Sequence, residues 1–325
     1  MGIRKESATG KYPAPSQPTF CRLYAQVSAL EVERAVLAFQ RQVRGAPPPG
    51  ELIVLDGQEP NHTRGQRVLT AVTVPGQHYL GSQMVADQSN EIPAARDRFE
   101  RLDLDGKAVS LDALHTQAET ARALVLEHGA DYLLTVKGNQ PTVQENIARH
   151  VATPPVAFPP EGSPTLARTH ERNKGRTETR GIRTAGITPE QAGFPLAAQA
   201  ARLRRQVDGR AAETVTLITS LAPTEPAAAR WLERNRQHWA IENGLHARLD
   251  VSRRDDQCRL KNRNAVWVHG IFARLANSLF MAWRTQQTKP AHKTTTDFTA
   301  HMAAEHARRV LLTVTARSPN LQAPS

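Results

Sequence analysis

Three carboxylates stand at positions where they could do chemistry together, Asp56, Asp112 and Glu242. Asp56 and Asp112 each close a short apolar run that predicts a buried strand, and Glu242 lies within a long helical pattern. Carboxylate oxygens suit Mg²⁺ or Mn²⁺, and two such ions about 3.5–4 Å apart can activate a nucleophilic oxygen and stabilise the leaving oxygen of a phosphodiester. If the acids converge, they predict a two-ion site for cutting nucleic acid.

Taken one at a time, each acid has an ordinary structural explanation. Asp56 stands in an Asp-Gly pair, which is typical of turns, and Asp112 can cap the approach to a helix. Glu242 can be a surface acid of its helix. It shares a predicted helical face with Leu245 and Leu249, however, so we expect it to turn inward.

Histidines flank two of these acids. His115 follows Asp112 by three residues and can orient it or cap the next helix. His238 and His246 lie one helical turn before and after Glu242. We interpret His238 as a hydrogen-bond donor to Glu242, with a packed core histidine as the alternative.

Polar residues beyond a further strand are also candidates. Lys137 can contact a DNA phosphate, the second acid, or only solvent. The amides of Asn139 and Gln140 can hydrogen-bond an unpaired base or form an ordinary turn.

The hydrophobic pattern supplies the elements that must position the acids. It predicts strands over 51–56, 67–74, 78–86, 107–112 and 131–137. It predicts helices over 90–102, capped by Asn90, and over 116–129, opened by a Thr116–Glu119 capping box. This order predicts an α/β, RNase H-like fold with a mixed five-stranded sheet and flanking helices, in which the strands ending at Asp56 and Asp112 are neighbours.

Composition along the chain suggests five regions. The first is an N-terminal remnant over 1–50, with a disordered lead-in over 1–19 and a helix over 20–43. The first part of the catalytic core follows over 51–140, and then an insertion over 141–222 with its own strands, including a strong strand over 213–220. A helical completion of the core over 223–285 carries Glu242, and a polar tail over 286–325 contains a short helix near 298–313.

The charge balance favours a polyanionic partner. Lys and Arg number 42 against 31 Asp and Glu, a net charge of +11 with a sequence pI of about 10.2. Nucleic acid is favoured over membrane, because neutralised phosphates release condensed counterions. Three basic runs can follow a DNA backbone, Arg172–Arg183, Arg202–Arg210 and Arg253–Arg263. Two cysteines exclude a disulfide framework, and the lack of a signal peptide or long apolar span predicts a cytoplasmic protein without membrane contact.

Several longer motifs resemble the signatures of bacterial insertion-sequence DDE transposases of the ISAs-type, or H-repeat-associated, group. The resemblance covers about 20–285, and its motifs are Ser89–Ile92, Ser110–Gln117, Asp131–Pro141, Gly175–Arg180 and His238–His246. It implies an RNase H-like catalytic domain interrupted by a β-containing insertion before its Glu-bearing helix. It also implies Asp56, Asp112 and Glu242 as the metal-binding triad.

The resemblance implies DNA strand cleavage and transfer during transposition, with double-stranded transposon ends as the partner. We expect a homodimer, because two ends must be brought together, and a place at the bacterial nucleoid. The same motifs add Arg176 and Asn243 to the residues expected to contact DNA or support the acids.

Three departures from the group's pattern support a second hypothesis. Gln58 follows the first Asp-Gly pair where the group has Lys, and Ala247 stands where it has Trp. The group also carries a longer helical N-terminal domain, so we expect an N-terminally shortened copy. The second hypothesis is therefore a catalytically inactive relic that only binds DNA. A third, resting on composition alone, is a protein whose basic surface meets RNA or acidic partners.

Overall fold

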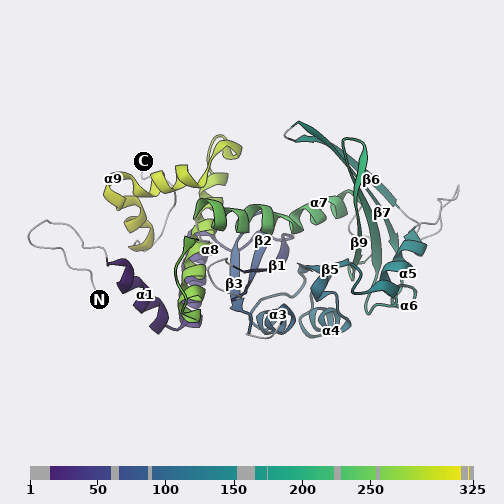
Figure 1. Ribbon diagram of the computed structural model, residues 1–325, viewed down its shortest axis with the longest axis horizontal. Coiled ribbons are helices and arrows are strands. Elements are labelled where there is room, and N and C mark those ends of the chain that lie inside the picture. Colours follow the sequence, from purple (N-terminus) through teal and green to yellow (C-terminus); the bar gives the residue numbers. More distant parts are fainter. Residues whose placement is uncertain are drawn as a thin grey trace, which may run out of the picture.

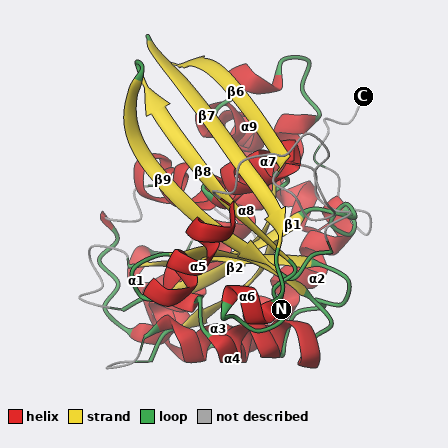
Figure 2. Ribbon diagram, turned by 90° about the vertical axis from the view of Figure 1, so that its right-hand side faces the viewer, coloured by secondary structure: helices red, strands yellow, loops and turns green. Residues whose placement is uncertain are grey.

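One large sheet organises the protein (Figures 1 and 2). The computed structural model describes residues 15–59, 66–86, 90–151, 165–173, 175–222, 228–253, 257–315 and 321. Within these residues, nine strands form a single sheet in the order β3-β2-β1-β4-β5-β9-β8-β7-β6.

The first five strands are the five that the sequence predicts. Their bounds are β1 (Leu52–Gln58), β2 (Val68–Val74), β3 (Tyr79–Met84), β4 (Ala108–Leu111) and β5 (Asp131–Val136). β1 pairs antiparallel with β2 and parallel with β4, and β4 pairs parallel with β5. This mixed pattern confirms the RNase H-like fold class, with helices on both faces of the sheet.

Helices lie on both sides of β1 in Figure 1, and alternate residues of the strand pack into these two layers. Ile53 and Leu55 pack into the core beneath the helices of one face, which are α3 (Glu91–Phe99), α4 (Ala118–Arg122) with its π-helical continuation η3 (Ala123–Glu127), and α5 (Pro141–Val151). Leu52 and Val54 pack against the other layer, which is α7 (Ala228–His238) and the π-helical segments η4 (Ile241–His246) and η5 (Arg248–Ser252). The sheet therefore has an α3 side and an α7 side, following the two-residue period of strands.

Local signals predict the ends of some of these helices and not others. Asn90 caps α3 as predicted, its side chain accepting from the backbone N–H of Ile92. The capping box at Thr116 is wrong: the helix begins at Ala118, and the Thr116 hydroxyl instead donates to the carbonyl of Thr135 on β5. The Thr116 hydroxyl that a local cap would use is therefore bonded to a residue of another strand.

The region predicted as an insertion extends the same sheet. It contributes β6 (Thr165–Asn173), β7 (Arg176–Gly186), β8 (Gln199–Val207) and β9 (Arg210–Thr219), with α6 (Pro189–Ala192) between β7 and β8. β9 pairs antiparallel with β5 and includes most of the predicted strand. We call these four strands the ribbon; they extend beyond the helical layers in Figure 2.

The N-terminal region folds onto the core as two helices, so the prediction of one helix over 20–43 is wrong. They are α1 (Gln17–Gln26) and α2 (Ala29–Arg44), separated because the Ser28 hydroxyl accepts from the N–H of Glu31 and starts a new helix. The predicted disordered lead-in extends too far, because α1 begins before residue 19; its residues 1–14 lie outside the described part. Both helices pack against α8 (Arg263–Thr285).

The predicted polar tail contains a packed helix, α9 (Thr295–Thr315), preceded by the short turn η7 (Pro290–His292). Phe298 of α9 is buried against Phe280 and Trp283 of α8, at ring-centroid distances of 5.9 and 5.6 Å. The tail is therefore partly core. By length and composition α8 could cross a membrane, but 56% of its most apolar window is buried, as in a core helix.

Candidate active site

Strand register places the first two acids side by side. The parallel pairing of β1 with β4 aligns Leu55 with Leu111; Asp56 is the next residue on β1, and Asp112 directly follows β4. By the same alternation, both follow Val54 and Ser110 on the α7 side of the sheet. Asp56 lies within β1, so the interpretation of its Asp-Gly pair as a turn is wrong.

Glu242 reaches this edge from a π-helical segment that continues α7. The helix is fixed over β4 by a hydrogen bond of 3.0 Å between His238 Nδ1 and Ser110 Oγ. His238 is buried, which fits the alternative of a packed core histidine, and no hydrogen bond joins it to Glu242 among the described contacts. The prediction that Glu242 turns inward is wrong: Leu245 is fully buried, whereas Glu242 is exposed. The wider π-turn separates the two side chains that a 3.6-residue period would align; such turns are frequent at functional sites.

The acids share one electrostatic environment. Burial raises the pKa of Asp56 to about 7, and the negative charges of Glu242, Glu91 and Asp112 contribute. Although the Glu242 side chain is exposed, partial desolvation and the charge of Asp112 raise its pKa, against an opposing effect of Lys137. The three predicted acids therefore gather at one site.

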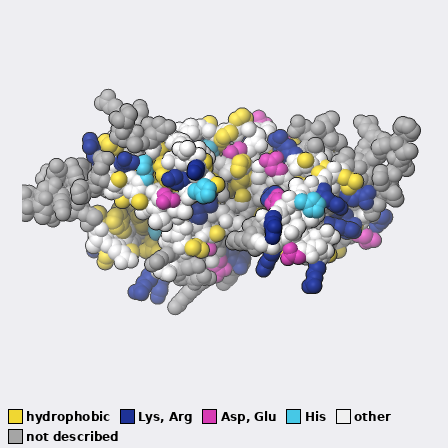
Figure 3. Space-filling view, turned by 90° about the horizontal axis from the view of Figure 1, so that it is seen from above, with side chains coloured by type: hydrophobic (Ala, Val, Ile, Leu, Met, Phe, Trp, Pro, Cys, Tyr) yellow, Lys and Arg dark blue, Asp and Glu magenta, His cyan; other side chains and the backbone are white. Residues whose placement is uncertain are grey.

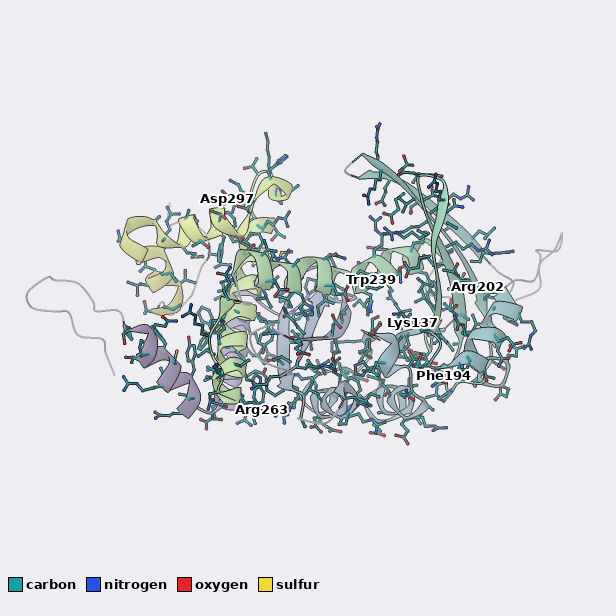
Figure 4. The ribbon with its side chains drawn as sticks, in the orientation of Figure 1. Lys137, Phe194, Arg202, Trp239, Arg263 and Asp297 are labelled. Carbon is teal, nitrogen blue, oxygen red and sulfur yellow. The ribbon has the colours of Figure 1, made fainter. Side chains whose placement is uncertain are left out.

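Among the described residues, Lys137 is the cation paired with one of these carboxylates. Lys137 Nζ lies 3.5 Å from Asp112 Oδ1. Figure 4 shows Lys137 below Trp239, which lies between α7 and η4. The side chains of Lys137 and Asp112 are about half exposed, so the pair contributes little to stability. The charge of one lysine against several acids leaves an excess of negative oxygen ligands, and this donor set fits a hard divalent cation.

A fourth acid, Glu91, belongs to the site and was not predicted. Its carboxylate lies over Gly57, where a Cβ on the glycine would overlap it. It contributes to the raised pKa of Asp56, and its Oε2 lies 3.7 Å from His115 Nε2. The sequence showed Glu91 only as an acid in the first turn of α3 and as part of a family motif, because its contact with Gly57 joins distant segments.

Two histidines near the acids, His246 and His238, have lowered pKa values, and a third, His115, is buried. His246 Nδ1 lies 3.5 Å from Asp56 Oδ2, and burial, aided by the charge of Arg274, lowers the pKa of His246 to about 3. Burial lowers the pKa of His238 to about 4. His115 is almost fully buried, and neither of its ring nitrogens has a hydrogen-bond partner among the described residues.

Several candidate residues serve the scaffold. The amide of Asn139 donates to the carbonyl of Ala113 at 2.7 Å, and that of Gln140 to the carbonyl of Thr116 at 3.0 Å. They therefore fix the turn after Asp112, and their contact with an unpaired base stays a prediction.

Two other candidates, Asn243 and Arg176, make no contact with the three acids among the described interactions. The Asn243 amide donates to the carbonyl of Trp239, one turn earlier in its own helix. Arg176 is exposed at the start of β7, on the ribbon. Gln58, which replaces the expected lysine, is buried and donates to Asp250 at 2.7 Å.

A sheet of this order, with carboxylates gathered where β1 and β4 end, defines a catalytic domain of the RNase H-like class. Residues 42–277 match the family described as the Transposase DDE domain. The chain belongs to this family and is a bacterial insertion-sequence transposase, an enzyme that acts on DNA.

Relatives agree with this assignment and with the H-repeat-associated group. The chain is 26% identical over 279 residues to "Putative transposase YncI" of Escherichia coli O157:H7, covering 82% of this chain and 70% of that protein. It is 24% identical over 267 residues to "H repeat-associated putative transposase YhhI" of Escherichia coli (strain K12), covering 78% and 69%. A third, "H repeat-associated putative transposase YbfD" of the same strain, is 27% identical over 137 residues, covering 40% and 53%.

Proposed function

We propose that Asp56, Asp112 and Glu242 hold two Mg²⁺ ions, replaceable by Mn²⁺, and cut and join DNA strands at transposon ends. The observation that carries this proposal is the convergence of the three acids from β1, β4 and η4 into one environment with excess negative charge. When bound, the ions would activate the attacking oxygen and stabilise the leaving oxygen of the phosphodiester.

The surrounding residues hold the ligands in place. The N–H of Gly57 donates to Asp56 Oδ1 at 3.0 Å, which fixes the carboxylate at the strand end. The bond between Ser110 and His238 fixes the helix that carries Glu242. Because Asp112 and Glu242 remain accessible, a DNA strand can reach them from solvent.

A plasmid-nicking assay tests the proposal. Supercoiled plasmid is incubated with the protein in Mg²⁺, Mn²⁺ or EDTA, and nicked and linear products are quantified. We expect the wild type to exceed Asp112→Asn by at least roughly 100-fold, because removing such a charge removes transition-state stabilisation. Asp97→Asn, an exposed acid on α3, is the matched control. Equal rates for wild type and Asp112→Asn would reject the metal triad.

The inactive relic remains the second candidate, because Gln58 binds Asp250 and brings no cation to the acids. It predicts DNA binding that depends on salt but not on divalent ions, and no product in any condition. Strand-transfer products with wild-type protein would eliminate it.

Two further features belong to the proposal, a homodimer that brings two transposon ends together and association with the nucleoid. Light scattering on the protein, alone and with end DNA, tests the first; a protomer mass with and without DNA would contradict it. Fluorescence microscopy of a tagged copy tests the second.

A further inference from the structure

The ribbon carries its charges unequally on two faces. Directly paired residues of an antiparallel sheet point to the same side, so the register assigns each side chain to a face. Ile182 and Leu203 are paired and belong to the core beneath α7, which defines the inner face. Ala185 and Ala200 are paired and belong to the core beneath α5, which defines the outer face.

The inner face neutralises its arginines with acids. It carries all three glutamates of the four strands, Glu171, Glu178 and Glu213. Arg205 Nε donates to Glu178 Oε1 at 2.7 Å, and Arg180 Nη2 lies 2.6 Å from the same oxygen. Arg236 of α7 pairs with Glu171. Arg176 and Arg210 also face this side by the register, so its four strand arginines stand against three glutamates and leave little net charge.

The outer face has no acid among its described side chains and carries five arginines, Arg168, Arg172, Arg183, Arg202 and Arg204. Arg183 and Arg202 lie directly opposite each other, and the buried Nε atoms of both have no hydrogen-bond partner in the described structure. Like charges placed opposite each other destabilise a sheet, so this arrangement costs stability unless an anion covers it.

A glycine opens the centre of this outer arginine face. Arg168 and Arg204 both pair with Gly181 on the strand between them, so no side chain separates the two guanidinium positions. A Cβ on Gly181 would meet no described atom within 4 Å. Glycine inside a strand often marks the close approach of a ligand.

The spacing of the outer arginine face suits a nucleic-acid backbone. Arg202 and Arg204 are two residues apart on β8, about 6.8 Å along the strand. This is about twice the 3.4 Å axial rise per phosphate of one DNA strand. Two exposed hydroxyls on the same face add donors, those of Thr177 and Thr214. Figure 3 shows Lys and Arg side chains gathered over the part of the molecule where the ribbon lies.

We propose that the outer arginine face binds the phosphate backbone of duplex DNA at a site separate from the catalytic acids. The inference rests on the proposed function only in taking DNA as the polyanion. Asp56 and Asp112 lie on the α7 side of the sheet, so the sheet itself separates them from this face. The DNA held here is therefore a different stretch from the one being cut, and it is held without sequence readout, because phosphate contacts carry none.

Salt-dependent binding of the full chain tests the assignment. Anisotropy of a labelled duplex of about 30 base pairs is measured in EDTA between roughly 50 and 200 mM KCl, where unneutralised catalytic acids repel DNA. Arg202→Gln with Arg204→Gln is expected to reduce the slope of log K against log salt by about 1.8, and to weaken binding roughly tenfold or more at 0.1 M salt.

The inner face supplies the matched control. Arg180→Gln with Arg205→Gln also removes two positive charges, from β7 and β8 of the ribbon, and it is expected to leave the slope unchanged. An equal loss in both double variants would overturn the distinction between the faces. Arg202→Lys with Arg204→Lys keeps both charges and is expected to keep the slope; if it binds as weakly as the glutamine variant, phosphate attraction is not the cause. Circular dichroism checks that all variants fold.

Two further outcomes separate this inference from its neighbours. An RNA duplex of the same sequence is expected to compete no better than DNA, and tighter competition by RNA would overturn the choice of partner. Failure of wild-type nicking in Mg²⁺ with the slope change intact would reject the proposed catalysis and leave the outer arginine face standing. Wild-type nicking without the slope change would support the proposed catalysis and reject DNA binding by the outer arginine face.

Discussion

Asp56→Asn should stabilise the metal-free protein at neutral and alkaline pH. The pKa of Asp56 rises from its ordinary 3.8 to about 7, chiefly through burial. Since one pKa unit corresponds to about 1.36 kcal/mol, the ionised carboxylate costs the fold at most about 4 kcal/mol. The side chain is only 18% exposed, so solvent screens this cost weakly.

The pH dependence has a definite sign. Between about pH 4 and pH 7 the unfolded chain has lost this proton while the folded protein keeps it, so the free energy of unfolding of the wild type falls as pH rises. Asparagine has no charge to gain. The stability advantage of Asp56→Asn should therefore be near zero at pH 4, grow through this window, and level off above pH 7.

Urea unfolding in EDTA, at a series of pH values, measures this difference. Asp97→Asn, which removes an exposed acid, should show no such rise. Adding Mg²⁺ should then stabilise the wild type more than Asp56→Asn, because an ion that binds only the folded state shifts the equilibrium toward it. A gain that is independent of pH, or absent at pH 8, would refute the electrostatic reasoning.

Three other substitutions test particular contacts. In the wild type, Arg98 Nη1 lies 2.6 Å from Glu33 Oε2, and both side chains are buried. Glu33→Ala leaves the Arg98 guanidinium without its carboxylate and should lower the free energy of unfolding in urea by about 3–5 kcal/mol. Gly57→Ala places a Cβ where the Glu91 carboxylate lies, and should reduce Mg²⁺-dependent nicking at least roughly tenfold, the order at which misplaced catalytic geometry is felt. Ser110→Ala leaves the buried Nδ1 of His238 without its partner and should cost about 1–3 kcal/mol in thermal unfolding.

Each has a control that separates its cause from general damage. Glu33→Ala combined with Arg98→Leu removes both charges and should recover part of the loss; no recovery would contradict the ion-pair explanation. Gly138→Ala adds a Cβ that meets no described atom within 4 Å, and an equal loss of nicking there would count against a specific role for Gly57. Ser110→Thr keeps the hydroxyl, so a loss as large as that of Ser110→Ala would show that the hydrogen bond is not responsible.

The parts of the fold that the sequence predicted depend on local pattern. The apolar runs that became β1 and β4 are short and bounded by polar residues, and one topological rule then makes the strands neighbours. The adjacency of Asp56 and Asp112 follows from these two steps. The predicted capping box failed for the opposite reason, because Thr116 makes a tertiary hydrogen bond to β5 that no local pattern records.

The helix carrying Glu242 marks a second limit. A period of 3.6 residues places Glu242 on the buried face of Leu245, yet the chain takes a π-turn at this position and Glu242 remains exposed. Local periodicity assumes the hydrogen-bond pattern that the active site alters. Predictions from periodicity therefore fail most often at functional sites, where the backbone departs from a regular helix.

Gly57 shows how one residue can carry information that sequence reasoning misassigns. The Asp-Gly pair at 56–57 indicates a turn by composition, but Gly57 lies in strand β1, where glycine is unfavourable. The space that a side chain would fill is occupied by the carboxylate of Glu91, which approaches from α3 and adds its charge to the field on Asp56. The glycine is thus explained by a contact made across the fold. Glu91 is the fourth acid that contributes negative charge to the proposed cation site. The Asp-Gly pair therefore reflects the space that the Glu91 carboxylate occupies and does not mark a turn.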